Sequence, residues 1–204
     1  MFLFRLSCPP YGTNAILFAC KETLKAAVVD PANGSAPALI KKAEEHGFQI
    51  EKILLTHSHW DHIVDLAALK EATKAPVYVH RLDAGNVEHP GSDNVPGLVM
   101  VRPTVPDVLL EDGQEITVGH LQIQVIHTPG HARGAVCFHF PHEHVLFSGD
   151  TVFRGAIGHL SLATSEPEKM SGSLQRLSQL PPDTRVIPGH GGETTIGRER
   201  LGDY

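Results

Sequence analysis

The segment Thr56-His57-Ser58-His59-Trp60-Asp61-His62 places four side chains of metal-binding type within six positions. His57 and His59 are two residues apart, so on an extended segment both point to the same side and can bind one ion. Asp61 and His62 follow where a helical pattern begins, and they can turn toward a second ion. Imidazole and carboxylate are the ligands expected for zinc or another borderline divalent metal. The chain holds 14 histidines, so a solvated turn with clustered histidines is the alternative interpretation.

Length and composition predict one α/β domain that spans residues 1–204. The apolar fraction of 41% and the charged fraction of 20% are typical of a soluble globular protein. No apolar run reaches the length of a membrane span, so no membrane partner is expected. The start, Met1-Phe2-Leu3-Phe4-Arg5-Leu6, has an arginine within it and is interpreted as a first strand rather than as a secretory signal.

The cysteine content bears on the cellular compartment of the protein, and the net charge bears on the class of partner that it can bind. Three cysteines, Cys8, Cys20 and Cys137, are too few and too scattered for a disulfide framework, which favours a cytoplasmic protein with buried thiols. The formal charge of −6 argues against nucleic acid as a partner, because phosphate binding normally leaves a basic footprint. The oligomeric state is left open.

Apolar patterning predicts strands that alternate with helices. Strands are expected at 1–6, 14–19, 26–29, 50–55, 77–79, 114–118, 121–126, 135–140, 145–147 and 185–187. Helices are expected at 35–46 with Ser35 as cap, from His62 to before Pro76, after a Ser165-x-x-Glu168 capping box, and briefly after Thr194. The irregular stretch 81–106 is where a compact domain often carries substrate contacts.

Three later residues of metal-binding type share one setting. His131, Asp150 and His190 each come directly after a glycine that follows a predicted strand. Because strand ends gather at one edge of a sheet, these residues can converge with the segment that begins at His57. A simple turn role remains the alternative for each of them taken alone.

At this point the chain resembles the metallo-β-lactamase-fold superfamily. Its motifs occur in the family's order: Thr56–His62, Thr128-Pro129-Gly130-His131, Ser148-Gly149-Asp150-Thr151 and Pro188-Gly189-His190-Gly191. The resemblance implies an α/β fold, a four-layer αβ/βα sandwich, with metals at one edge between the two sheets. It also implies two divalent metal ions, with zinc expected and iron or manganese as alternatives.

The same resemblance implies a division of the ligands. His57, His59 and His131 would hold the first metal. Asp61, His62 and His190 would hold the second metal, and Asp150 would bridge the two.

Within the superfamily the match looks closest to the glyoxalase II-like, or hydroxyacylglutathione hydrolase-like, thioester hydrolases. Gly149-Asp150-Thr151-Val152-Phe153 is similar to that branch. Only 14 residues follow His190, so the C-terminal helical domain of that branch is expected to be absent. After Gly158, where such hydrolases often present a basic residue, this chain has His159-Leu160-Ser161-Leu162, which leaves glutathione recognition open.

The expected activity is that of a dinuclear hydrolase that cleaves small acyl thioesters by attack of a metal-bridging hydroxide. Asp61 and Asp150 are the expected catalytic carboxylates, with Asp61 orienting the water and taking its proton. A lactone or another ester is the next choice of substrate. A mononuclear non-haem iron dioxygenase acting on persulfides, and a binding module without turnover, are the alternatives from other classes.

Four further residues have two open interpretations. Trp60 lies between ligands and is expected to be a packing residue rather than a platform for the substrate. Arg133, Arg154 and Arg198 are the basic residues nearest in sequence to the ligand loops. Each either is solvated or meets a carboxylate of the substrate.

Overall fold

Two six-stranded sheets form the centre of the fold, and the computed structural model describes residues 1–203. The first sheet has the order β1-β2-β3-β4-β5-β6, with strands Phe2–Cys8, Thr13–Ala19, Lys25–Val29, Gln49–Leu54, Val77–His80 and Val108–Leu110. The second has the order β14-β13-β10-β9-β8-β7, with strands Thr194–Thr195, Arg185–Pro188, Val145–Gly149, Val136–Phe140, Leu121–His127 and Glu115–Val118. A small third sheet pairs β11 (Val152–Phe153) with β12 (Ala156–Ile157).

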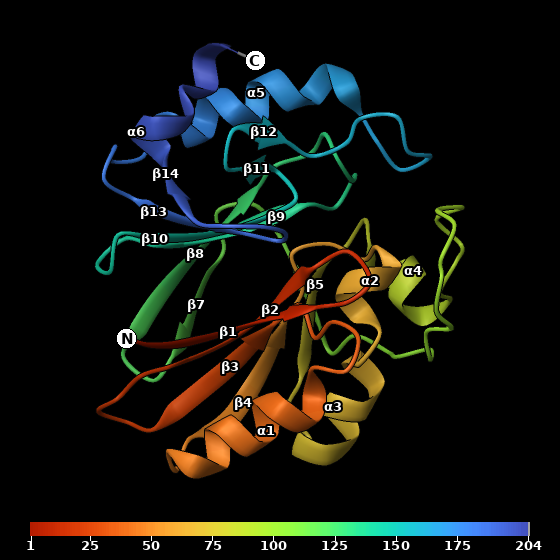
Figure 1. The fold of residues 1–204 in the computed structure, drawn as a ribbon, viewed down its shortest axis with the longest axis vertical. Coiled ribbons are helices and arrows are strands. Elements are labelled where there is room, and N and C mark those ends of the chain that lie inside the picture. The colour runs from red at the N-terminus through yellow and green to blue at the C-terminus, as the bar shows by residue number, and fades with distance from the viewer. Residues whose placement is uncertain (204) are drawn as a thin grey trace.

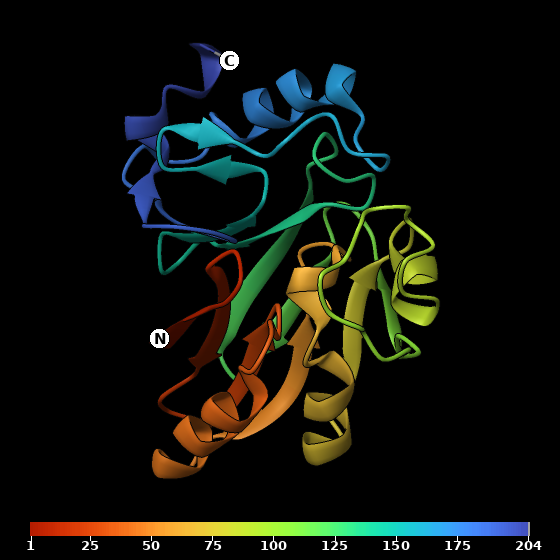
Figure 2. The same cartoon turned by 45° about the vertical axis from the view of Figure 1, so that its right-hand side comes forward.

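Helices cover the outer face of each large sheet (Figure 1). They are α1 (Ala36–Glu45), α2 (Trp60–Ile63), α3 (Leu66–Thr73), α4 (Ala84–Glu88), α5 (Pro167–Leu177) and α6 (Ile196–Glu199), followed by the 3-10 turn η1 (Leu201–Asp203). Figure 2 shows α5 above the second sheet and α1 and α3 below the first. The predicted four-layer αβ/βα sandwich is therefore confirmed.

Three apolar cores lie between the four layers. One joins the first sheet to α1 and α3, one fills the space between the sheets, and one joins the second sheet to α5. Strand β2 shows how one sequence serves two cores, because its side chains alternate. Leu17 faces the helices, whereas Ile16 and Phe18 face the other sheet.

The predicted helix starting at His62 is present but broken. Helix α2 begins at Trp60, two residues earlier, and ends at Ile63, and α3 restarts at Leu66. The break turns the chain so that Asp61 and His62 stay at the sheet edge while Leu66 packs into the core below. A purely periodic pattern of apolar residues does not reveal such a break.

Two predicted helix caps are wrong. Ser35 stands at the start of α1 but makes no side-chain cap bond; instead Asp65 Oδ2 accepts from Ala36 N at 2.8 Å. Helix α5 begins at Pro167, beyond Ser165, so the capping box does not form. Ser165 Oγ instead donates to His131 O at 3.0 Å.

The stretch 81–106 contains α4, and β6, β11 and β12 are further elements that the patterning did not predict. The last three are only two or three residues long, too short for a periodic signal.

The short helix after Thr194 is confirmed as α6, where Thr195 Oγ1 accepts from Arg198 N at 3.3 Å. Among residues 1–203, no helix combines the length and apolar character that crossing a bilayer requires. The single-domain assignment stays a prediction.

The packing between the sheets generates a stability prediction. Phe18 is fully buried, with its ring centroid 5.1 Å from that of Phe140 and 5.6 Å from that of Phe147. We expect Phe18→Ala to lower the free energy of unfolding by about 3–5 kcal/mol, because it opens a cavity at the centre of the sandwich. Leu109→Ala, at a position 51% exposed, is the control and should change stability by less than about 0.5 kcal/mol. Urea denaturation of both variants measures the difference; equal midpoints would contradict it.

Candidate metal centre

The seven predicted ligands come from both sheets and meet at one edge of the sandwich. The segment after β4 carries His57 to His62, while the loops after β8, β10 and β13 carry His131, Asp150 and His190. Six of the seven side chains are buried, and His190 is partly exposed. The structure thus brings together every residue that the sequence singled out for metal binding.

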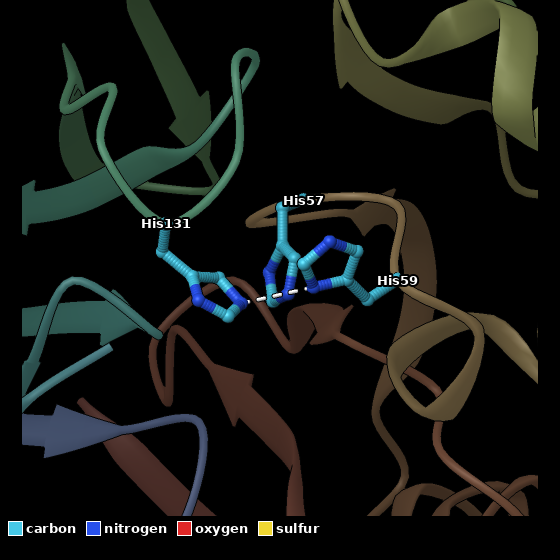
Figure 3. A group of neighbouring side chains, drawn as sticks. All are labelled: His57, His59 and His131. Carbon is cyan, nitrogen blue, oxygen red and sulfur yellow. Dashed lines mark hydrogen bonds between the residues drawn. The ribbon is translucent and has the colours of Figure 1, made fainter. Parts of the chain in front are cut away.

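His57, His59 and His131 form one group, with their ring nitrogens turned toward a common point (Figure 3). His131 Nε2 lies 2.9 Å from His59 Nδ1. The ring of His57 stands edge-on to both, with centroid distances of 4.6 Å to His59 and 5.1 Å to His131. Three imidazoles in this arrangement are a typical divalent-metal ligand set.

Asp61, His62 and His190 form the other predicted group. His62 Nε2 lies 3.3 Å from His190 Nε2 and 3.5 Å from Asp61 Oδ2. Asp150 lies between the two groups: its Oδ1 is 3.4 Å from His62 Nε2, and its Oδ2 is 3.5 Å from His131 Nε2. This is the position that a bridging carboxylate requires.

Hydrogen bonds outside the group set which nitrogen of each imidazole faces inward. His131 Nδ1 donates to His159 O at 2.8 Å, and His190 Nδ1 donates to Tyr11 O at 3.2 Å. His62 Nδ1 likewise donates to a carboxylate. Because a carbonyl or carboxylate oxygen only accepts, Nδ1 of each of these three imidazoles carries a proton and Nε2 faces inward.

Asp30 orients one histidine in each group. Its Oδ2 accepts from His62 Nδ1 at 3.0 Å and from Thr56 Oγ1 at 2.6 Å. The Thr56 hydroxyl, having donated its proton, accepts from His57 Nδ1 at 3.1 Å. One buried carboxylate therefore fixes His62 directly and His57 through Thr56.

The unpaired atoms fit metal ions. His57 Nε2 and Asp150 Oδ1 are buried without a hydrogen-bond partner among the described residues, an arrangement that is costly unless an ion completes it. Burial, with His131 nearby, lowers the pKa of His59 to about 3, so it is neutral and free to ligate. Burial alone would lower the pKa of His62, but Asp61, Asp150 and Asp30 raise it to about 10.

Two glycines allow the loops to approach closely. A Cβ at Gly189 would collide with Asp150 Oδ1, and a Cβ at Gly158 would collide with the main-chain oxygen of Asp150. Both positions therefore admit no side chain without moving Asp150.

Asp83 ties the two ligand loops together. Its Oδ2 accepts from Ser58 N at 2.7 Å, beside His57 and His59, and its Oδ1 accepts from Gly134 N at 2.8 Å, three residues after His131. Burial raises the pKa of the Asp83 carboxyl above its usual range, although these two N–H donors oppose the shift. The carboxylate thus spans the gap between the sheets.

Sequence reasoning missed the roles of Asp30, Asp83 and Thr13. Thr13 Oγ1 donates to Asp61 Oδ2 at 2.6 Å. Asp30 comes directly after an apolar strand, a signal similar to the one that located Asp150, and the structure gives it a φ of +48°. Asp83 and Thr13 carry no local signal, because their partners are distant in sequence.

A cavity of about 570 Å³ opens above the centre. Trp60 is only 7% exposed, and its ring packs edge-on against Tyr11 with a centroid distance of 5.5 Å. The expected packing role is therefore present, but Trp60 also lines the cavity.

The metallo-β-lactamase superfamily model matches residues 8–190, and the chain belongs to this superfamily. The superfamily binds metal ions, and some relatives of this chain are named as hydrolases. A hydroxyacylglutathione hydrolase of Pseudomonas entomophila is 36% identical over 196 residues, which span 95% of this chain and 67% of that protein.

Solved structures show the same fold over nearly the whole chain. The BLEG-1 B3 metallo-β-lactamase has a TM-score of 0.89 at 33% identity and covers 97% of this chain and 96% of its own. TTHA1623 in a di-iron-bound form has a TM-score of 0.85 at 39% identity, with 96% of both chains covered. ETHE1 from Myxococcus xanthus has a TM-score of 0.81 at 25% identity, covering 100% of this chain and 85% of its own.

The raised pKa of His62 predicts that metal binding releases a proton. With a pKa of about 10, His62 is protonated at pH 7 in the metal-free protein, and its Nε2 must lose that proton to ligate. We expect release of about one proton per chain from this residue at pH 7, and tighter metal binding as the pH rises toward 10. Calorimetric titration with zinc in buffers of different ionisation enthalpy measures the release.

His142→Gln, an exposed histidine remote from the centre, should leave the release unchanged, whereas His62→Gln should remove this proton. A binding heat that is independent of the buffer would contradict the assignment.

Asp83 generates a second prediction. Asp83→Ala leaves the buried N–H groups of Ser58 and Gly134 without an acceptor, and we expect a loss of about 1–3 kcal/mol in stability for each. We also expect weaker metal binding by the His57, His59 and His131 group, because the two loops are no longer held together. Thermal unfolding and elemental analysis test both effects. Asp183→Ala, an exposed acidic residue, is the control; if both variants behaved alike, Asp83 would have no positioning role.

Proposed function

We propose that this protein is a dinuclear metal-dependent hydrolase that cleaves small acyl thioesters. The observation that carries the proposal is the position of Asp150 between two complete ligand groups. Its carboxylate lies within 3.5 Å of His62 Nε2 on one side and His131 Nε2 on the other. A site for one ion has no use for the second group of Asp61, His62 and His190.

Two bound divalent ions would supply Lewis acidity, lowering the pKa of water and polarising an acyl oxygen. The protein's own contribution is to hold and orient. Asp61 is fixed by Thr13 and faces the cavity, so its carboxylate is placed to orient the attacking water and take its proton. Trp60 and Phe153 line the same cavity and give it apolar surface.

A thioester suits this site because it needs little acid catalysis. The water oxygen bonds to the acyl carbon, the carbon–sulfur bond breaks with its electron pair on sulfur, and the water's proton ends on the thiolate. A thiol pKa near 8.5 makes sulfur a good leaving group. The products are a carboxylic acid and a thiol.

The similarity to a hydroxyacylglutathione hydrolase supports the thioester class, and the di-iron form of TTHA1623 makes iron a metal to test beside zinc. The similarity to a B3 metallo-β-lactamase adds β-lactams to the substrates to be screened. The mononuclear iron dioxygenase and the lactonase remain the alternatives.

Asp150→Ala tests the two-ion arrangement. Removal of the carboxylate between the groups should lose one metal per chain and lower turnover at least about a hundredfold. Loss of a residue that only orients a ligand already lowers activity by up to about a hundredfold, and Asp150 is itself a predicted ligand. Cys137→Ser, a buried thiol that donates to Ser148 O, is the control and should keep both metals and turnover. Near-normal activity of a folded Asp150→Ala protein would remove the two-ion mechanism.

A substrate screen on protein of known metal content separates the alternative activities. The panel holds S-lactoylglutathione, other acyl thioesters, lactones, a β-lactam and glutathione persulfide. Two metals per chain with thioester turnover support the proposal. One iron per chain with oxygen consumption on the persulfide would overturn it in favour of the dioxygenase.

A further inference from the structure

The cavity above the metal centre has an apolar wall. Besides the residues of metal-binding type, its lining includes one aliphatic and aromatic set: Tyr11, Trp60, Val95, Pro96, Phe153 and Leu162. A pocket of this size that combines an apolar wall with a few polar groups at its base is typical of a site for a small organic ligand.

The lining offers no lysine or arginine to an anionic group. Of the described residues that form the cavity, the exposed side chains outside the predicted ligand set that could donate to a carboxylate are Tyr11 and His159. Arg133, Arg154 and Arg198, the basic residues near the ligand loops, are exposed and lie outside this lining. A carboxylate on the non-reacting part of a substrate would therefore find no bidentate guanidinium or ammonium partner here.

Trp60 is the buried part of the apolar wall, whereas Tyr11 is 55% exposed. Trp60 packs against Tyr11 on one side, and on the other a Cβ at Gly97 would lie 3.4 Å from its ring. Leu162 lies two residues before Thr164, whose Oγ1 is 2.8 Å from His59 Nε2. The wall and the metal-type side chains are thus parts of one packed unit.

A second, smaller cavity adjoins the first. It has a volume of about 170 Å³, and Trp60 and Val95 line both cavities. Ile63, Val99 and Met100 give it apolar walls, whereas Asn86 and Asp93 give it a polar side. Trp60 and Val95 therefore present apolar surface to both cavities.

We propose that the preferred substrate is a thioester with an extended, uncharged and apolar acyl chain that lies against Trp60, Phe153 and Leu162. This inference rests on the proposed thioester hydrolysis and names the class of acyl group. The reacting carbonyl would face Asp61 and Asp150 at the base of the cavity, and the chain would run along its apolar wall. Each fully buried methylene is worth about fourfold in affinity.

The test uses the metal-loaded full chain and a series of N-acetylcysteamine thioesters, in which only the acyl group changes. We expect kcat/KM to rise about tenfold or more from acetyl to hexanoyl, since four methylenes become at least partly buried. S-lactoylglutathione, with a short polar acyl group and a carrier bearing carboxylates, should fall below the hexanoyl ester by about tenfold or more.

Variants of the wall show where the preference arises. Phe153→Ala and Leu162→Ala should flatten the chain-length series, and elemental analysis of both variants reports whether the metal centre is intact. Leu162→Lys should raise the rate on S-lactoylglutathione relative to the hexanoyl ester. Leu24→Ala, 46% exposed in the β2–β3 turn remote from the centre, should leave the series unchanged.

The possible failures are distinguishable. A flat series, or S-lactoylglutathione as the fastest substrate, would overturn this inference and leave thioester hydrolysis standing. A protein with two metals that hydrolyses none of these thioesters would overturn the proposed function and this inference with it.

Discussion

The site depends on one constraint: five imidazoles and two carboxylates share a buried space, and each must find a partner. Desolvation makes an unpaired charge or an unpaired ring nitrogen costly. Four imidazoles avoid an unpaired Nδ1 because each Nδ1–H donates a hydrogen bond to an acceptor outside the group. In the order His57, His62, His131 and His190, the acceptors are Thr56 Oγ1, Asp30 Oδ2, His159 O and Tyr11 O. The inward nitrogens then face one another, an arrangement that a bound cation stabilises.

The outer partners explain why both sheets are needed. The His57 to His62 segment belongs to the first sheet, and the other three ligand loops belong to the second. Main-chain bonds join the sheets at this edge: Val136 N donates to Thr56 O at 2.8 Å, and Asn14 N donates to Gly189 O at 2.7 Å. Asp83 adds a side-chain tie at the same place. The contacts that join the two sheets at this edge therefore also hold the ligand loops of the site together.

The features that could be predicted were those that depend on residues close together in the sequence. Glycine-ligand pairs after apolar strands located His131, Asp150 and His190, and alternating apolar residues located the strands around them. What escaped depends on partners distant in sequence: Ser165 bonds to His131 O instead of capping α5, and Asp65 caps α1 across 29 residues. A single sequence records that these polar residues exist, but not which buried N–H or C=O they will satisfy.

The segment 158–165 both orients ligand imidazoles and lines the cavity. Its main chain and hydroxyls contact the imidazole-bearing residues, and other side chains line the cavity. His159 O accepts from His131 Nδ1, and the hydroxyls of Thr164 and Ser165 contact His59 Nε2 and His131 O. The side chains of His159 and Leu162 instead line the cavity. Because the carbonyl that orients His131 does not depend on the side chains at 159 and 162, these two positions can change the substrate that is accepted without changing the imidazole geometry. The fold thus keeps the chemistry of the centre separate from the choice of acyl group, although one segment of eight residues contributes to both.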